Sequence, residues 1–249
     1  MLIAIPSIVV FAIAIWIYFR LRNYDVAIDV NRGIKAILIA IIIGFAISII
    51  FPPILFSGIH FGGENFYIFF HTVLAAPIAE EALRRKYSGK IDLARPFSVL
   101  AFGFGFAFGE YILKITRELY QLYEHAYSLF IAQQMQDFIF DADGFSDFFI
   151  YRTLGAVSVF IMHVGISLLY ISPFRPKNTF LLFILCVLLH SLMNWITMHV
   201  YFMIESDWAM LIWNLGRTIF FGRLGLTILR AHNVFVWPPN SQRIANPKN

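Results

Sequence analysis

Charged residues are scarce in this 249-residue chain: Asp, Glu, Lys and Arg make up 14% of it, against about 25% in an ordinary soluble domain. Apolar residues make up 59%, more apolar surface than a water-facing fold of this length can bury. We therefore expect an integral, multi-pass membrane protein with lipid as its solvent. The single cysteine, Cys186, excludes a disulfide within the chain. The net charge of +4 resides mainly in short segments between apolar runs, so no nucleic-acid partner is expected.

Seven apolar runs are long enough to cross a bilayer, for which a helix needs about 20 residues. The predicted fold is therefore all-α, a polytopic membrane protein of about seven transmembrane helices in which residues 1–249 form a single transmembrane domain. The predicted spans are 2–19, 34–53, 66–83, 96–114, 153–172, 179–201 and 208–225.

Basic residues fall almost entirely on one side of these predicted spans. Sixteen of the 19 lie on that side, and only Lys114, Arg117 and Arg152 lie on the other. Because basic loops stay in the cytoplasm, the N-terminus is expected outside and the C-terminus inside. Residues 115–152 then form a long external loop with an amphipathic helix near 117–139. That helix is either an interfacial helix on the outer leaflet or a lid that docks substrate.

Ionisable and amide side chains within the predicted spans are costly to place in lipid, so each marks a candidate functional site. They come from four different spans, which favours a shared site over isolated packing residues. The candidates are Glu80 and Glu81 at the end of the third span, Glu110 in the fourth, His163 in the fifth, and His190 with Asn194 in the sixth.

Helical spacing groups some of these residues. Glu80 and Glu81 each lie four residues before an arginine, Arg84 or Arg85, so each pair can share a helix face. His190 and Asn194 are also four apart and can face one cavity. Pro77 precedes the acidic pair and is expected to disturb the helix there. In the fourth span, Ala101, Gly105 and Gly109 form a stripe of small residues that allows another helix to approach closely.

The depths of these residues can be estimated from a rise of about 1.5 Å per residue. Both histidines then lie near the middle of the membrane and can meet. Glu80 and Glu110 come out about 19 Å apart in depth, so one of the two acids, not specified further, is expected to join the histidines. The plainer alternatives are histidines that serve packing, and a Glu81–arginine cluster that is only a charged helix end.

The ordered set of motifs resembles the CAAX-protease/bacteriocin-processing superfamily. Glu80-Glu81-Ala82-Leu83-Arg84-Arg85 fits its EExxxR signature and nearly fits the EExxK of the PrsW-like branch, which would have Lys where this chain has Arg84. Phe106 to Glu110 resembles the FxxxE motif of that branch, and His163 followed by His190 to Asn194 resembles its later His and HxxxN motifs. The resemblance places a protease-like core over residues 66–201. The arrangement also resembles the anterior-pharynx-defective scaffold subunit of γ-secretase.

The resemblance implies a metal-independent glutamic peptidase, without cofactor, that cleaves a membrane-embedded or membrane-anchored protein. In this interpretation Glu80 is the general base, and His163 or Glu110 orients the attacking water. His190 and Asn194 donate hydrogen bonds to the oxyanion. The supporting residues are Arg84 and Arg85, one of which pairs with Glu81, together with Phe106. The alternatives are a zinc peptidase, a proton-coupled transporter, and a catalytically silent scaffold that binds partner proteins.

Overall fold

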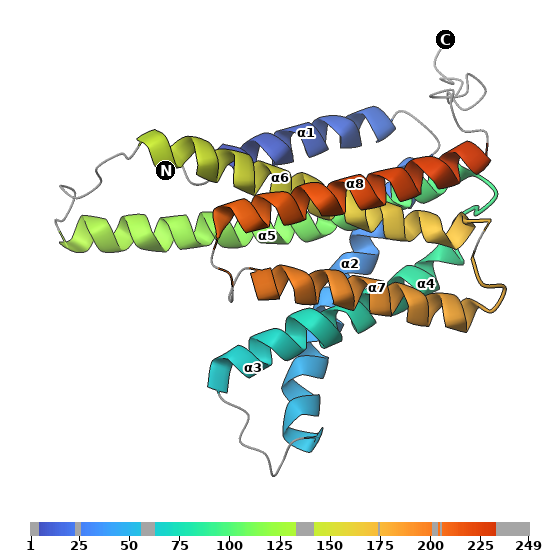
Figure 1. Ribbon diagram of the computed structural model, residues 1–249, viewed down its shortest axis with the longest axis horizontal. Coiled ribbons are helices and arrows are strands. Elements are labelled where there is room, and N and C mark those ends of the chain that lie inside the picture. Colours follow the sequence, from blue (N-terminus) through green and yellow to red (C-terminus); the bar gives the residue numbers. More distant parts are fainter. Residues whose placement is uncertain are drawn as a thin grey trace.

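The computed structural model describes residues 5–22, 26–55, 63–132, 142–173, 175–200, 204 and 206–232. These residues are helical with short connections and contain no β-strand, so the predicted all-α class is confirmed (Figure 1). The helices are α1 (Ile5–Arg22), α2 (Ala27–Leu55), α3 (Gly63–Phe70), η2 (His71–Ala75), α4 (Ala76–Ser88), α5 (Pro96–Ala132), α6 (Ala142–Leu168), η4 (Leu169–Ile171), α7 (Thr179–His199) and α8 (Asp207–Ala231).

Four helical segments are long and apolar enough to cross a membrane. They have the length and composition expected of a membrane protein. A shorter apolar stretch, Val9–Leu21, lies in α1. The predicted last span corresponds to α8, in which Arg217 and Arg223 interrupt the apolar run. The four segments are Ala27–Ile50, Pro96–Leu113, Thr153–Ile171 and Thr179–His199.

The predicted third span is a helix with a break in its middle. It begins as α3, continues as the five-residue π-helix η2, and resumes as α4. Pro77 occupies the first turn of α4. Its ring nitrogen carries no hydrogen, and its ring crowds the carbonyl of the preceding turn, so the regular α-helical ladder cannot run through this point. The disturbance expected before the acidic pair is therefore present.

The region 115–152 differs from its prediction. Its described first part, up to Ala132, is not a separate helix but the continuation of α5, which is 37 residues long. No proline or glycine lies between Gly109 and Ala132 to end it. The following helix, α6, begins at Ala142 rather than near 153. Residues 133–141 lie outside the described residues, and in Figure 1 the far end of α5 extends beyond the other helices.

The small residues of α5 form the contact surface that the sequence predicts, and α2 is the helix that packs there. A methyl group on Gly105 would overlap the backbone of Val30, and one on Gly33 would overlap the backbone of Phe102. A methyl group on Gly109 would meet the side chain of Ile37. Such close backbone approach is typical of small residues between membrane helices. This contact fixes the position of the helix that carries Glu110.

The remaining helices complete the bundle around α5. α6 packs against both α5 and α8, and α4 packs against α2 and α7. In Figure 1, α5, α6 and α8 lie roughly along one direction, whereas α2 crosses them and carries its far end, with α3, away from the bundle. Four buried ionisable residues, Glu80, Glu81, His163 and His190, lie where α4, α6 and α7 approach one another.

Candidate functional site

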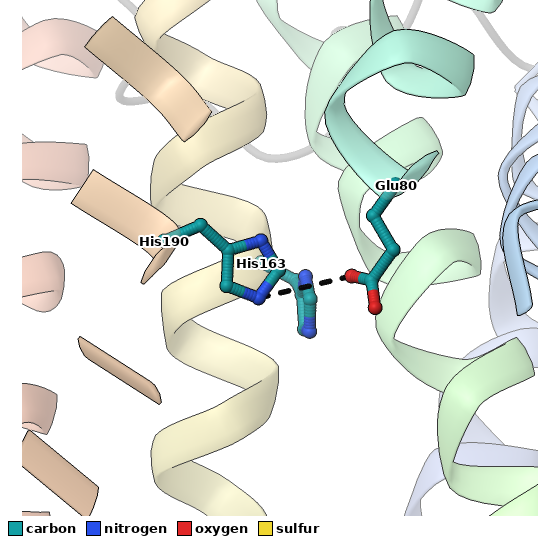
Figure 2. A group of neighbouring side chains, drawn as sticks. All are labelled: Glu80, His163 and His190. Atoms are coloured by element: carbon teal, nitrogen blue, oxygen red, sulfur yellow. Dashed lines mark ion pairs between the residues drawn. The ribbon is translucent and has the colours of Figure 1, made fainter. Parts of the chain in front are cut away.

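Three side chains from three helices point toward one another in the middle of the bundle. Figure 2 shows Glu80 from α4, His163 from α6 and His190 from α7. One ligating atom of each lies within 4.8 Å of the others. Glu80 is 6% exposed, and the two histidines are 1% and 2% exposed. The expected meeting of the two histidines is thus observed, with Glu80 beside them.

Glu110 of α5 joins the same site. Its Oε2 atom lies 2.5 Å from Nε2 of His163. Its side chain is 36% exposed, whereas the other carboxylates of the site are almost fully buried. Both acids therefore meet the histidines, although the depth arithmetic favoured one of them.

Both acids can meet the histidines because α4 extends further than the predicted span. The predicted span ended at Leu83, because three basic residues follow it, but α4 continues to Ser88. Glu80 therefore lies about 12 Å from the end of its helix, and Glu110 lies about 21 Å from the start of α5. A short connection joins those two helix ends. The offset in depth falls from about 19 to about 9 Å, which two glutamate side chains on inclined helices can span.

Glu81 and Arg84 form a completely buried ion pair. Arg84 Nε donates to Glu81 Oε2 at 3.0 Å, and neither side chain is exposed. The other oxygen of Glu81, Oε1, lies 3.0 Å from Nδ1 of His190. Consecutive residues of a helix point about 100° apart, so Glu80 and Glu81 approach His190 from different sides. The prediction that Glu81 turns toward an arginine is confirmed for Arg84.

Arg84 connects three helices. Its Nη1 atom donates to the His163 carbonyl at 3.1 Å and to Ser167 Oγ at 2.5 Å, and its Nη2 atom lies 2.9 Å from His163 Nδ1. Its guanidinium carbon lies 3.8 Å from the centroid of the Phe106 ring. These contacts use the planar fork and the flat face that distinguish arginine from lysine. Arg84 is thus the centre of a network across α4, α5 and α6.

Arg85 does not pair with Glu81. Its Nη2 atom donates to Thr179 Oγ1 at 3.3 Å, and its guanidinium lies over the rings of Phe180 and Phe183. The expected i,i+4 pairing is therefore replaced by the i,i+3 pair between Glu81 and Arg84. The reason is that Arg84 points into the bundle while Arg85 points toward α7.

The contacts of His163 define its protonation. A guanidinium has only donors, so Nδ1 of His163 must accept from Arg84 Nη2. The neutral ring then carries its proton on Nε2, the atom that faces Glu110 Oε2. Both ring nitrogens of His163 are therefore engaged, one by a cation and one by a carboxylate.

In His190 the Nδ1 atom faces a carboxylate, whereas in His163 it faces a guanidinium. That carboxylate, Glu81, is already paired with Arg84, so Nδ1 of His190 carries a proton. Its Nε2 atom lies 3.8 Å from Glu80 Oε2. That oxygen is buried and has no hydrogen-bond partner among the described residues. A carboxylate that orients a histidine, whose second nitrogen faces the reacting groups, is the arrangement of acid–base catalytic sites.

Asn194 contributes elsewhere. Its Nδ2 atom donates to the carbonyl of Thr72 at 2.9 Å, within the π-helix that interrupts the third predicted span. A π-helical turn leaves backbone groups without their usual partners, and Asn194 satisfies one of them. The described contact thus assigns this amide to holding the broken helix, one turn along α7 from His190.

Sequence analysis missed a second buried arginine. Arg217 of α8 is 4% exposed, although its position had been counted among the basic residues of the last span and tail. It donates to Ser158 Oγ at 2.5 Å, Thr197 Oγ1 at 3.2 Å and Asn214 Oδ1 at 3.0 Å, all neutral oxygens. Its place in the interior of an apolar run was the available signal. Without it, 15 basic residues remain on the predicted cytoplasmic side.

Comparison with known proteins found no match among family models, curated proteins or solved structures.

Proposed function

We propose that this chain is an intramembrane glutamic peptidase that cleaves a membrane-embedded or membrane-anchored protein. Its motifs resemble those of the CAAX-protease/bacteriocin-processing superfamily, and in particular those of the PrsW-like branch. The proposal includes a multi-pass protein of seven spans with an external N-terminus and a cytoplasmic C-terminus. Four strongly apolar helical segments support the membrane location.

One observation carries the catalytic proposal: a buried oxygen of Glu80 without a hydrogen-bond partner among the described residues lies 3.8 Å from His190 Nε2. Buried polar atoms are almost always satisfied, and an exception calls for an explanation such as a catalytic role. Glu81 is paired with Arg84 and holds His190 in place. Glu80 is thus the carboxylate available for proton transfer.

The proposed reaction uses Glu80 as the general base. Glu80 accepts a proton from a water molecule as the water oxygen bonds to the scissile carbonyl carbon. His190 acts in its imidazolium form between the two glutamates: Nδ1–H donates to Glu81, and Nε2–H donates a hydrogen bond to the developing oxyanion. When the carbon–nitrogen bond breaks, the proton on Glu80 passes to the leaving amine. Glu110 is partly exposed and orients the water, while the Arg84–His163 pair keeps Glu110 and His190 in position.

The tautomer of His163 argues against a zinc peptidase. Glu80, His163 and His190 form a donor set that zinc sites can use. A zinc ligand needs a free lone pair on its nitrogen. In His163, however, Nδ1 accepts from Arg84, and Nε2 carries the proton toward Glu110. Metal binding there would require either removal of the single proton of the neutral ring or loss of the Arg84 contact.

A catalytically silent scaffold is the second candidate. It is favoured by the network itself, because Glu81, Arg84 and His163 satisfy one another inside the bundle. Asn194 likewise binds backbone rather than His190. In a scaffold, however, a buried, unsatisfied Glu80 oxygen would lower stability without a compensating function.

A cleavage assay separates the two candidates. The purified protein is reconstituted in liposomes with a set of single-span substrate proteins, and product is followed by mass spectrometry. Glu80→Gln should abolish cleavage while thermal unfolding stays close to that of the wild type. Asp92→Asn also replaces a carboxylate by an amide, but at a surface residue with a half-exposed side chain. It should change neither cleavage nor the unfolding temperature. Turnover by Glu80→Gln would remove this residue as the base.

The proposed orientation has its own test. Cys186 is the single cysteine, so a Cys186→Ala background allows cysteines to be introduced one at a time. A cysteine at Lys90 should react with impermeant maleimide only from the cytoplasmic side. Labelling from the outside would show that the proposed topology is wrong and that the 84–95 connection is external.

A further inference from the structure

A polar pocket lies at the end of the bundle where α4 and η4 end and α7 begins. It has a volume of about 730 Å³. Arg85, Arg175 and Lys177 bring three positive charges to its lining, and none of its described lining residues is acidic. It is separate from the Glu80–His190 site, whose members do not line it. With no carboxylate among the described lining residues, such a concentration of cations attracts an anion.

Tyr170 supplies a second, independent observation. It lines the pocket, it is 5% exposed, and its hydroxyl has no hydrogen-bond partner among the described residues. A buried tyrosine hydroxyl usually has a partner. Tyr170 is therefore a wall residue of this pocket whose buried hydroxyl is left without a described partner.

Arg85 is held in an orientation that brings its charge to this pocket. Its hydrogen bond to Thr179 and its position over Phe180 and Phe183 hold the guanidinium beside α7, where it lines the pocket. Phe180 and Leu181, which begin α7, are more than half exposed. A ligand in this pocket would thus lie beside the Arg85 guanidinium and close to the exposed apolar start of α7.

We propose that this pocket binds a phosphate group, carried either by the headgroup of an anionic lipid or by free phosphate. A phosphate group offers several acceptor oxygens and at least one negative charge, which the arginine and lysine donors of the lining can satisfy. Basic pockets at the ends of membrane helices recognise lipid headgroups in this way. The proposal is independent of peptidase activity.

The test is thermal unfolding of the full-length protein in detergent, followed by the fluorescence of its five tryptophans. Three probes are titrated: short-chain phosphatidic acid, phosphatidylcholine of the same chain length, and inorganic phosphate. Phosphatidic acid should raise the unfolding temperature in a saturable manner, and phosphatidylcholine should not. A response to phosphatidic acid alone identifies a lipid headgroup, whereas an equal response to inorganic phosphate identifies the free ion.

Variants of exposed residues connect the response to the pocket. The double variant Arg175→Gln/Lys177→Gln should weaken the apparent affinity by about 30-fold. Lys86→Gln removes one charge from the exposed side of α4, outside the pocket lining, and should change nothing. The proposal is overturned if neither phosphate probe stabilises the protein, if phosphatidylcholine acts equally, or if the double variant responds like the wild type.

Discussion

Arg84 Nη2 lies 2.9 Å from Nδ1 of His163, and this contact joins the last turns of α4 and α6. Because the guanidinium can only donate, it fixes the tautomer of the histidine and directs the Nε2 proton toward Glu110. The same guanidinium neutralises Glu81, which in turn holds His190. One buried cation thereby sets the hydrogen-bonding state of both histidines.

Replacement of Arg84 should therefore lower the free energy of unfolding in the first place, and affect cleavage only as a consequence. Arg84→Met leaves Glu81 buried without its ion-pair partner, and we expect a loss of about 3–5 kcal/mol in the free energy of unfolding. Arg84→Lys keeps the charge but cannot reach Glu81, Ser167 and His163 together, so its loss should be intermediate. The measurement is unfolding in mixed micelles of mild detergent and dodecyl sulfate.

A double-mutant cycle provides the control for this prediction. Glu81→Gln alone strands the guanidinium and should also be strongly destabilising and lower activity, because it releases His190. The combination of Glu81→Gln with Arg84→Met removes both charges, so its cost should be clearly smaller than the sum of the single costs. Additive effects would mean that the two residues do not form the pair described above.

Asn194 offers a test of the role of the broken helix. Asn194→Ala removes the donor to the Thr72 carbonyl, and we expect a loss of about 1 kcal/mol with faster amide exchange confined to residues 71–76. Ser191→Ala is the matched control on the same helix, because the buried hydroxyl of Ser191 has no described hydrogen-bond partner. A complete loss of cleavage in Asn194→Ala, without faster exchange, would instead support the oxyanion role.

Sequence patterns identify the helices of this chain but locate their ends poorly. Apolar runs mark where a helix is buried, and all seven runs contain described helix. Charged residues were interpreted as marking where a span stops, and this interpretation is wrong at Arg84, which is fully buried. An arginine whose charge is neutralised by a neighbour on the same helix can lie inside the bundle. That pairing cannot be seen in a hydropathy pattern.

The sequence predicts which residues belong to the site better than it predicts which of them contact one another. Helical spacing and the order of the motifs place Glu80, Glu81, His163 and His190 among the candidates, and the structure brings them together. The partners of each nitrogen and oxygen depend on the inclination and rotation of four helices, which spacing along one helix does not contain. Arg217 was overlooked because it was counted only among the sixteen basic residues that orient the chain, although it lies inside a predicted span.

Metal removal should leave the protein unchanged. Because both nitrogens of His163 are engaged by Arg84 and Glu110, we expect that prolonged dialysis against a chelator alters neither cleavage nor the unfolding temperature. The addition of zinc afterwards should likewise give no gain in activity. Cleavage that is lost with chelator and restored by stoichiometric zinc would contradict the tautomer assigned to His163 and favour a metallopeptidase.

The close contact between α2 and α5 leads to the last prediction, which compares two identical substitutions. A methyl group added at Gly105 overlaps the backbone of Val30, whereas one added at Gly216 of α8 meets nothing within 4 Å. Alanine is favoured over glycine within a helix by about 0.5–1 kcal/mol. Gly216→Ala should therefore stabilise the protein slightly, and Gly105→Ala should destabilise it by about 1–3 kcal/mol through overpacking.

The two variants should also differ in activity. Gly105 lies on α5 five residues before Glu110, so pushing α5 away from α2 also displaces Glu110 from His163. Even a displacement of about 1 Å can cost about 100-fold in rate, and Gly105→Ala should lose cleavage at temperatures where it remains folded. Gly216→Ala should retain it. Equal stability and activity of the two variants would show that the α2–α5 contact is looser than described and does not position Glu110.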